Sequence, residues 1–233
     1  MSEAILSFEG ASYAEDADHD CGLDEVELAL SPGELVLVRV PPDALRIPLA
    51  DGAQGLVQPR AGRVLFEGRP WPGRSVAELA LARARIGRVY EGAEWVSNLD
   101  LDENVILPAC HHSSRSEQEI VAEGIALAGR FGLSDLPAVR RNRADRLTLR
   151  ALALVRALLG GPRLLLLERP LRDGADQSLG PALKSCLDEA RAKGSAVLWT
   201  TSNPSVWQDG SIASTARLQV QGTLLEPVPE PRS

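Results

Sequence analysis

The chain has 233 residues, 44% of them hydrophobic, and a formal net charge of −7. This is enough for one globular domain with a substantial core. The negative charge, without a basic stripe or an RNA-binding motif, argues against nucleic acid as a partner, and no segment has the roughly 20 apolar residues of a membrane-spanning helix.

The N-terminal segment 1–8 lacks the basic start and the long apolar run of a secretory signal. We therefore expect a cytoplasmic protein, peripheral to the inner membrane, that reaches the membrane only through a partner. Cys21, Cys110 and Cys186 have neither metal-ligand nor redox spacing, so reduced thiols are expected.

Short apolar runs, separated by turns rich in Gly, Pro and Asp, predict five strands in the first 90 residues. These strands span 5–8, 26–30, 35–40, 63–66 and 86–90.

Two polar clusters contain residue types that bind metals. Adjacent side chains rarely bind one ion, and metal sites usually gather ligands from distant segments. We therefore predict a polar surface loop at each cluster and no metal site. The clusters are His19 with Glu15, Asp16, Asp18 and Asp20, and Cys110 with His111 and His112.

The segment after the third predicted strand has the position of a phosphate-binding loop. On the pattern G-x-x-x-x-G-K-[ST], Val40 and Leu45 replace the glycines, Arg46 replaces the lysine, and Ile47 and Pro48 replace the hydroxyl residues. Such a loop binds phosphate because its glycines let backbone N–H groups converge on the anion, while the lysine contacts the terminal phosphates and the hydroxyl helps to bind Mg²⁺.

Each replacement removes one of these contributions. Val40 and Leu45 disfavour positive φ and fill the space that glycine leaves for the ligand, and Ile47 has no oxygen for a metal. A planar guanidinium does not substitute for a compact ammonium. Pro48 removes an N–H donor from the start of the next helix, and Asp43 adds a negative charge. The loop alone does not exclude an ordinary strand-to-turn connection.

The C-terminal half alternates helices and buried strands. Helical periodicity predicts helices over 116–131, 146–159 and 179–193, and the second and third are followed by apolar strands at 164–167 and 196–199. Helix followed by buried strand, twice, is typical of a parallel sheet covered by helices, so an α/β fold is predicted.

Ordered landmarks from about residue 5 to about residue 225 resemble those of the ATP-binding subunits of ABC transporters. The resemblance implies an α/β, P-loop NTPase-like nucleotide-binding domain at 1–226. That domain would have a mixed sheet core, an antiparallel β lobe and a helical lobe at about 97–160, followed by a disordered Pro-rich tail at 227–233. The landmarks are LDEV at 23–26, SPGE at 31–34, AGRVLFEG at 61–68, RIG at 85–87, ENVILP at 103–108, FGL at 131–133, VRAL at 155–158 and LLLL at 164–167 with Pro170.

At each position where the family acts on nucleotide, the resemblance places a different residue. The glutamine that contacts Mg²⁺ corresponds to Glu91, the Walker B aspartate to Glu168, the catalytic glutamate to Arg169 and the switch histidine to Ser202. Arginine is protonated at neutral pH and cannot act as the general base, and a hydroxyl cannot replace a cationic imidazole at the γ-phosphate.

Three other family positions are also changed. The signature sequence LSGGQ corresponds to ADRLT at 144–148, which includes Asp145. The D-loop aspartate corresponds to Ala175, with Asp176 as the alternative, and the aromatic residue that stacks on adenine would lie near Tyr13.

These losses together predict a pseudo-ATPase, with weak or absent ATP and Mg²⁺ binding and no cofactor. The chain would be a structural or regulatory subunit of a membrane transport complex, most similar to lipid-trafficking Mla/Mce-type or lipoprotein-exporting systems. Its partners would be a transmembrane permease and a second ABC subunit, either another copy or an intact paralogue. The alternatives are a soluble module that senses nucleotides or anions without hydrolysis, and an unconventional ATPase with Glu91 and Glu168 as metal ligands.

Closure of the nucleotide pocket by the chain's own side chains is a further hypothesis. Val40, Leu45 and Ile47 would fill its volume. Arg46 or Arg169 would pair with Asp43 or Glu168, because an unpaired charge there would be costly. The alternative is a solvated, arginine-rich face.

The family groove for a permease lies between the core and the helical lobe. On that resemblance, Glu91, Trp95, Val96 and Leu99 are the predicted partner-binding residues. Packing of Trp95 on the core is the alternative.

Overall fold

The computed structural model describes residues 3–44, 46–92, 95–112, 114–172, 174 and 176–228. Its first sheet is antiparallel, with strand order β2-β1-β4-β5. Alternation of buried and exposed residues along β2 matches a strand with one face on the core. This sheet is the predicted antiparallel lobe. Its strands are β1 (Leu6–Tyr13), β2 (Leu23–Leu30), β4 (Ala61–Phe66) and β5 (Arg69–Pro70).

The second sheet is mixed and has strand order β10-β9-β3-β8-β7-β6. All its pairs are parallel except β9 with β10. The predicted fold class is therefore confirmed. Its strands are β3 (Leu35–Arg39), β6 (Ile86–Val89), β7 (Leu164–Glu168), β8 (Ala196–Thr201), β9 (Ala216–Gln221) and β10 (Leu224–Pro227).

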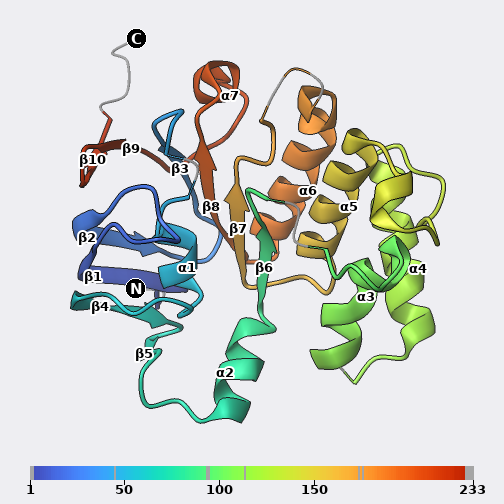
Figure 1. Cartoon of the computed structure of the whole chain (residues 1–233), viewed down its shortest axis with the longest axis horizontal. Coiled ribbons are helices and arrows are strands. Elements are labelled where there is room, and N and C mark those ends of the chain that lie inside the picture. Colours follow the sequence, from blue (N-terminus) through green and yellow to red (C-terminus); the bar gives the residue numbers. More distant parts are fainter. Residues whose placement is uncertain are drawn as a thin grey trace.

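The three predicted helices are present within one residue at each end. The longest of these three helices is α4. Ser116 and Glu119 form a capping box at its start, and Gly132, at φ 83°, follows its C-cap. Figure 1 shows α3, α4 and α5 together on the right, at the predicted helical lobe. The helices are α1 (Leu49–Ala53), α2 (Val76–Arg83), α3 (Leu101–His112), α4 (Glu117–Arg130), α5 (Arg146–Leu158), α6 (Gly180–Ala192) and α7 (Pro204–Gln208), with 3₁₀ turns at Arg141–Arg143 and Asp176–Leu179.

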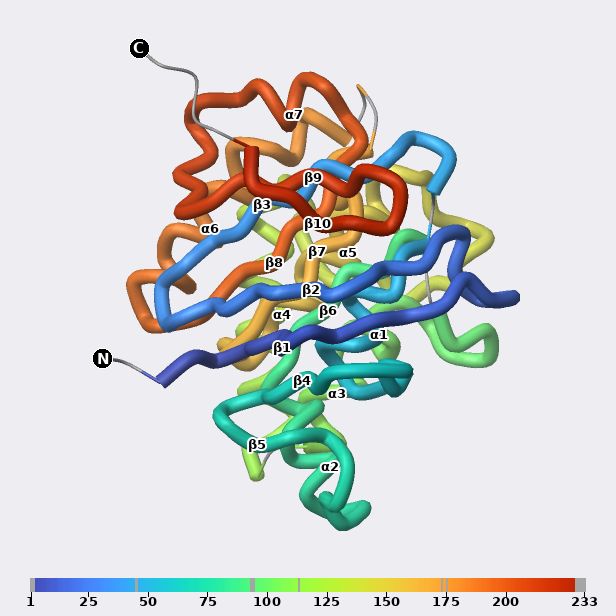
Figure 2. The backbone as a smooth tube through the Cα atoms, turned by 90° about the vertical axis from the view of Figure 1, so that its left-hand side faces the viewer, coloured from blue at the N-terminus to red at the C-terminus, as the bar shows by residue number. Residues whose placement is uncertain are grey.

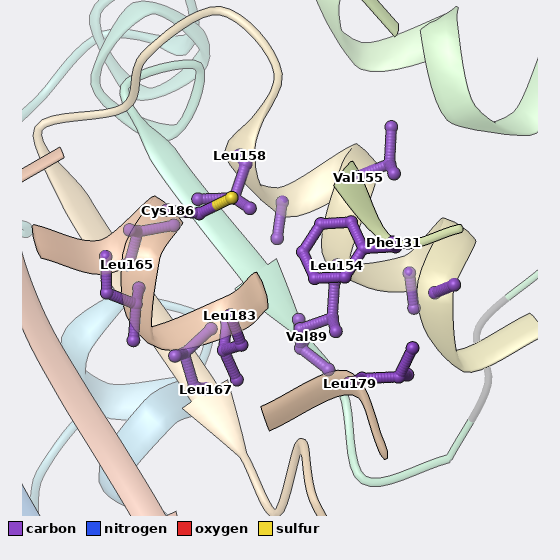
Figure 3. Close-up of a cluster of buried hydrophobic side chains, with 14 of the residues drawn as sticks. Val89, Phe131, Leu154, Val155, Leu158, Leu165, Leu167, Leu179, Leu183 and Cys186 are labelled. Carbon is purple, nitrogen blue, oxygen red and sulfur yellow. The ribbon is translucent and has the colours of Figure 1, made fainter. Parts of the chain in front are cut away.

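The central strands β7 and β8 of the mixed sheet are buried on both faces. Leu165 and Leu167 of β7 point into a first core that includes Leu183 and Cys186 of α6, as Figure 3 shows. Leu164 and Leu166, on the other face, pack in a second core against the antiparallel sheet. Burial on both faces explains the uninterrupted leucine run.

The end of the domain extends slightly beyond the predicted boundary. Pro227 is the last residue of β10, opposite Leu218, and the N–H of Val228 bonds the carbonyl of Arg217 at 2.9 Å. The proline is tolerated because β10 is an edge strand. Residues 229–233 lie outside the described residues. Within the described residues no helix is long and apolar enough to cross a bilayer.

Candidate functional site

The positions that the resemblance singled out gather at the carboxyl ends of parallel strands. The loop 40–48 follows β3, Glu91 follows β6, and Glu168 with Arg169 ends β7. Ligands of open α/β sheets bind at this edge.

The loop after β3 is filled by its own side chains. Val40 and Ile47 are 3% and 6% exposed and pack in the second core, while Leu45 lies outside the described residues. Pro48 begins α1 without a side-chain cap, and α1 has only five residues. A helix this short adds little dipole for an anion.

Arg169 occupies the inside of this loop. One guanidinium nitrogen, Nη2, donates hydrogen bonds to the carbonyls of Pro41 and Ala44, both at 2.7 Å. The side chain is 4% exposed and lies 3.8 Å from the carboxylate of Glu91. A phosphate loop turns N–H groups toward an anion, whereas two carbonyls here converge on a cation. The polarity of the loop is therefore reversed.

The predicted charge pairs are wrong. Arg46 turns outward, 54% exposed, and donates to the carbonyl of Ala17 at 3.3 Å. Asp43 is exposed, with no ion pair among the described residues. Glu168 instead accepts a hydrogen bond from Arg88, a residue that was not among the predicted site residues. Because Arg169 reaches the loop carbonyls instead, Arg88 of the adjacent strand neutralises Glu168.

An ionic network, buried at Arg88 and His19 and exposed at Asp16, connects β7 to the N-terminal half. Arg88 Nε donates to Glu168 Oε1 at 2.6 Å, and Arg88 Nη1 donates to Asp51 Oδ1 at 2.7 Å. The other Asp51 oxygen lies 2.9 Å from Nε2 of His19, whose Nδ1 lies 3.0 Å from Asp16. Five side chains thus link β7, β6, α1 and the loop 14–22.

This network changes the interpretation of the first polar cluster. The predicted surface loop is wrong for His19, which is 4% exposed because two carboxylates bind both of its ring nitrogens. Cys110, His111 and His112 are exposed but belong to the end of α3, not to a loop. The described residues contain no group of three or more His, Cys, Asp or Glu placed to hold a metal ion.

A hollow of about 790 Å³ lies over the network. Of the predicted positions, Arg46, Ile47, Glu91 and Glu168 line it. Carboxylates outnumber guanidinium groups in the lining, so the hollow disfavours a polyanion such as a triphosphate. The charged lining residues are Asp16, Asp18, Asp20, Asp51, Glu91 and Glu168 against Arg46, Arg88 and Arg172, with His19 beside them.

Glu91 is held between two arginines. Its carboxylate, 9% exposed, lies 3.8 Å from Arg169 and 3.3 Å from Arg172. Burial raises the pKa of Glu91 despite both positive neighbours. A ligand that used Glu91 would have to break these ion pairs.

Other predicted positions lie outside the hollow. Asp145 caps α5, accepting from the N–H of Thr148 at 2.9 Å. Ser202 is half-buried just after β8. Asp176 is fully buried near Arg146 and Arg150, at 3.4 and 3.7 Å, and Ala175 lies outside the described residues.

Tyr13 is not available to stack on a ligand. The side chain is 2% exposed in the second core, and its hydroxyl lies against Gly52 of α1, where an added Cβ would be 2.2 Å away. Burial raises the Tyr13 pKa. The predicted role for an aromatic at this position is therefore wrong for Tyr13.

A second groove, of about 450 Å³, lies between β6 and helices α2, α3 and α5. Of the four predicted partner-binding residues, Val96 lines it and is 45% exposed. Leu107 adds a second exposed apolar side chain. Trp95 instead packs against the first core, with Arg156 4.7 Å above its ring. Leu99 is half-buried outside the lining.

Comparison with known proteins gives a consistent set of relatives, although no family model matches the chain. The chain is 29% identical over 189 residues to the lipoprotein-releasing system ATP-binding protein LolD of Granulibacter bethesdensis, covering 79% of this chain and 80% of that protein. It is 30% identical over 161 residues to the phosphonates import ATP-binding protein PhnC of Alcaligenes faecalis, covering 65% and 57%. It is 28% identical over 201 residues to the macrolide export ATP-binding/permease protein MacB of Rhodopseudomonas palustris, covering 85% and 29%. The match thus spans just over half of PhnC and under a third of MacB.

Solved structures agree on the fold. An ATP-binding subunit of an ABC transporter superposes with a TM-score of 0.78 at 19% identity, covering 95% of this chain and 88% of that one. The dimeric bacterial ABC transporter cassette MJ0796 gives a TM-score of 0.78 at 18% identity, covering 95% and 96%.

Proposed function

The chain is related in sequence and fold to the ATP-binding subunits of ABC transporters, and we propose that it is a catalytically inactive member. It would act as a structural or regulatory subunit of a membrane transport complex. The main support is Arg169, whose guanidinium fills the loop where a nucleotide phosphate would lie.

Two further contacts support inactivity. The carboxylate of Glu168, at the Walker B position, is bonded by Arg88 in a buried site. The catalytic base position is Arg169 itself, which is cationic and hydrogen-bonded to the loop. Phosphoryl transfer depends on positioning and charge stabilisation. Position 169 carries no general base, and the carboxylate at position 168 is already engaged by Arg88 and is not free to bind a metal ion.

The groove beside Val96 and Leu107 is the proposed docking surface for a permease. Its exposed apolar side chains lie between the sheet and the helical lobe, and Arg156 adds a charge at the same place. The name of the relative LolD, a lipoprotein-releasing system ATP-binding protein, supports a complex that handles lipoproteins. On this proposal the chain would lie on the cytoplasmic side of the inner membrane, bound to the permease.

Calorimetric titration with Mg²⁺ and ATP tests the loss of nucleotide binding. We expect no heat of binding up to millimolar ATP, because side chains fill the loop and carboxylates surround the hollow. An intact ATP-binding subunit in the same buffer is the positive control. Micromolar affinity, or phosphate release abolished by Glu168→Gln, would contradict the proposal.

Copurification tests the docking groove. The chain should copurify with a permease expressed from its own genomic neighbourhood, and Val96→Glu with Leu107→Glu should reduce recovery about tenfold or more, because charges enter an apolar contact. Val76→Glu with Leu81→Glu is the matched control, since both residues are exposed on α2 outside the groove lining. Equal losses in the two double variants would refute the assignment of the groove.

A further inference from the structure

Helix α2 turns an apolar stripe of side chains toward solvent. Val76 and Leu81 are 85% and 63% exposed, the two highest values for large apolar side chains among the described residues. Of the eight residues of α2, only Ala82 is buried. The members of the stripe fall within about 140° of arc on an α-helix, so they share one face. We define the α2 stripe as Val76, Ala77, Ala80, Leu81 and the C-cap residue Ala84.

Local contacts hold α2 in place without help from the stripe. Ser75 and Glu78 form a capping box at its start, and Arg69 donates a hydrogen bond to Glu78 at 3.0 Å. On the inner side of the helix, Leu79 packs against the second core. The stripe contributes to none of these contacts, so it is a surface patch of the kind that binds another molecule.

Four arginines lie beside the α2 stripe. A hollow of about 300 Å³ is lined by Leu81 of the stripe together with three of them. The fourth, Arg83, belongs to α2 and lines the groove proposed for the permease, next to Ala84 of the stripe. The arginines are Arg69, Arg74, Arg83 and Arg85. An exposed apolar face with cationic groups beside it is typical of helices that lie on a membrane surface.

These arginines outnumber the carboxylates around them. The segment 67–85 holds the four arginines and two acidic residues, Glu67 and Glu78, whereas the whole chain has a net charge of −7. Each glutamate pairs with one of the arginines. Arg74 and Arg83 donate instead to backbone carbonyls and make no ion pair among the residues that the structure describes. This end of an acidic molecule is therefore locally positive.

The α2 stripe lies at one end of the molecule, next to the proposed docking groove. In Figures 1 and 2, which differ by a turn about the vertical axis, α2 and the turn after β5 form the lower end. Ala84 belongs both to the stripe and to the lining of the groove. A permease held in the groove would therefore bring α2 close to the membrane in which the permease lies.

We propose that the α2 stripe rests on an anionic lipid surface, with the four arginines bound to headgroup phosphates around it. This inference rests on the proposed function, because the permease in the groove is what brings this end of the molecule to the bilayer. Val76 and Leu81 would enter the boundary between headgroups and acyl chains, while the long arginine stems let the guanidinium groups reach the phosphates. The chain then contacts the membrane itself, in addition to its contact through a partner.

A lipid surface fits the α2 stripe better than a second protein surface does. A protein partner would need a hollow shaped to a projecting helix, whereas lipids rearrange around it. Headgroup phosphates match the planar, forked donors of arginine. Because the rest of the chain is acidic, an anionic surface attracts this end and repels the others, which orients the molecule.

Flotation of the purified chain with lipid vesicles, in the absence of a permease, tests the proposal. We expect about fivefold more protein to float with vesicles containing about 30% phosphatidylglycerol than with pure phosphatidylcholine vesicles, at about 0.05 M NaCl. Raising the salt to about 0.5 M should release most of the bound protein, because screening shortens the reach of the arginine charges.

Two double variants change the α2 stripe in opposite directions. Val76→Glu with Leu81→Glu should lower vesicle binding about fivefold or more, since carboxylates enter an apolar and anionic boundary. Val76→Trp with Leu81→Trp should raise it about fivefold or more, because tryptophan favours the membrane interface. A folding defect would not give this gain. Leu147→Glu with Leu224→Glu, which makes the same change in net charge at exposed leucines of α5 and β10, is the matched control and should bind as the wild type does.

The outcomes separate the lipid contact from its premise. No flotation of the wild type with anionic vesicles, equal flotation with neutral ones, or no gain in the tryptophan variant overturns the lipid contact and leaves the copurification and the ATP titration unaffected. If Val76→Glu with Leu81→Glu instead loses the permease in detergent while vesicle binding is unchanged, the stripe binds protein and the proposal is wrong. A chain that floats but never copurifies with a permease keeps the lipid contact and overturns the premise.

Discussion

Replacing Arg88 with methionine is expected to lower the free energy of unfolding by about 3–5 kcal/mol, because it leaves the buried carboxylate of Glu168 without its cation and removes one of the two partners of Asp51. Arg88 is 5% exposed and donates to both Glu168 and Asp51. Methionine matches the length of the stem but has no positive charge. In a chain of this size the melting temperature should fall by about 10 °C.

The loss should depend on pH in a defined direction. Burial alone would raise the pKa of Asp51, but the charge and hydrogen bond of Arg88, with His19, lower it below its usual range. A depressed carboxylate pKa stabilises the fold above the unfolded-state pKa, about 3.9, and that contribution disappears as pH falls. The Asp51 part of the Arg88→Met penalty should therefore be present at neutral pH and shrink below about pH 4. A penalty that grows on acidification would contradict the assigned pairing.

Urea unfolding of a small set of variants measures this effect. Arg85→Met is the matched control, since Arg85 is 50% exposed and pairs with Glu67 on the surface, where such a pair contributes about 1 kcal/mol or less. The double variant Arg88→Met with Glu168→Gln should recover part of the loss, because one uncompensated charge is removed together with the cation. No recovery would show that Glu168 is not the charge stranded by the mutation.

The fold was predictable where local pattern and burial agree. The helix at 116–131 has a capping box and a terminal glycine, and the leucine run at 164–167 is a strand buried on both faces; both are confirmed. The sequence did not predict α3, which contains Pro108 and has weak periodicity, or α1, which has five residues. Short helices are stabilised by tertiary packing more than by their own sequence.

The sequence predicted which nucleotide-binding residues of the family are replaced in the site. It did not predict which contacts the replacement residues make. Comparison with the family pattern placed Arg169 and Glu168 correctly at the end of β7 but paired them wrongly. Arg88 and Asp51 occupy positions to which the family pattern gives no role, and they are 37 residues apart. Only the parallel pairing of β6 with β7 brings Arg88 to Glu168. A charged residue in the apolar strand 86–90 was the one local indication, because an isolated buried cation requires partners.

Removing Arg169 should produce the second large effect. Arg169→Ala is expected to lower the free energy of unfolding by about 2–4 kcal/mol, because the carbonyls of Pro41 and Ala44 lose a charged donor. Of its two ion pairs, Glu91 would retain the one with Arg172. Hydrogen exchange should increase first in the loop 40–44, where these contacts are lost.

Backbone conformation provides a sharp comparison at this position. Arg169 has φ 45°, a left-handed conformation that costs a non-glycine residue about 1 kcal/mol or more. Arg169→Gly loses the same contacts as Arg169→Ala but adopts this φ without strain, so it should be the more stable of the two by about 1 kcal/mol. Arg172→Ala is the matched control: it also faces Glu91 but is 45% exposed, so its loss should be about 1 kcal/mol or less. Equal losses at positions 169 and 172 would refute the role assigned to the loop carbonyls.

Emptying the loop should not create a nucleotide site. In Arg169→Gly the guanidinium is gone, yet Val40 and Ile47 still fill the second core and Glu168 is still bonded by Arg88. The carboxylates of the hollow also have one cation fewer beside them, so the local potential becomes less favourable for a triphosphate. Calorimetry on this variant should again give no heat with Mg²⁺ and ATP. Binding that appears on this single change would mean that Arg169 alone blocks the site, and that the other replacements leave its phosphate chemistry intact.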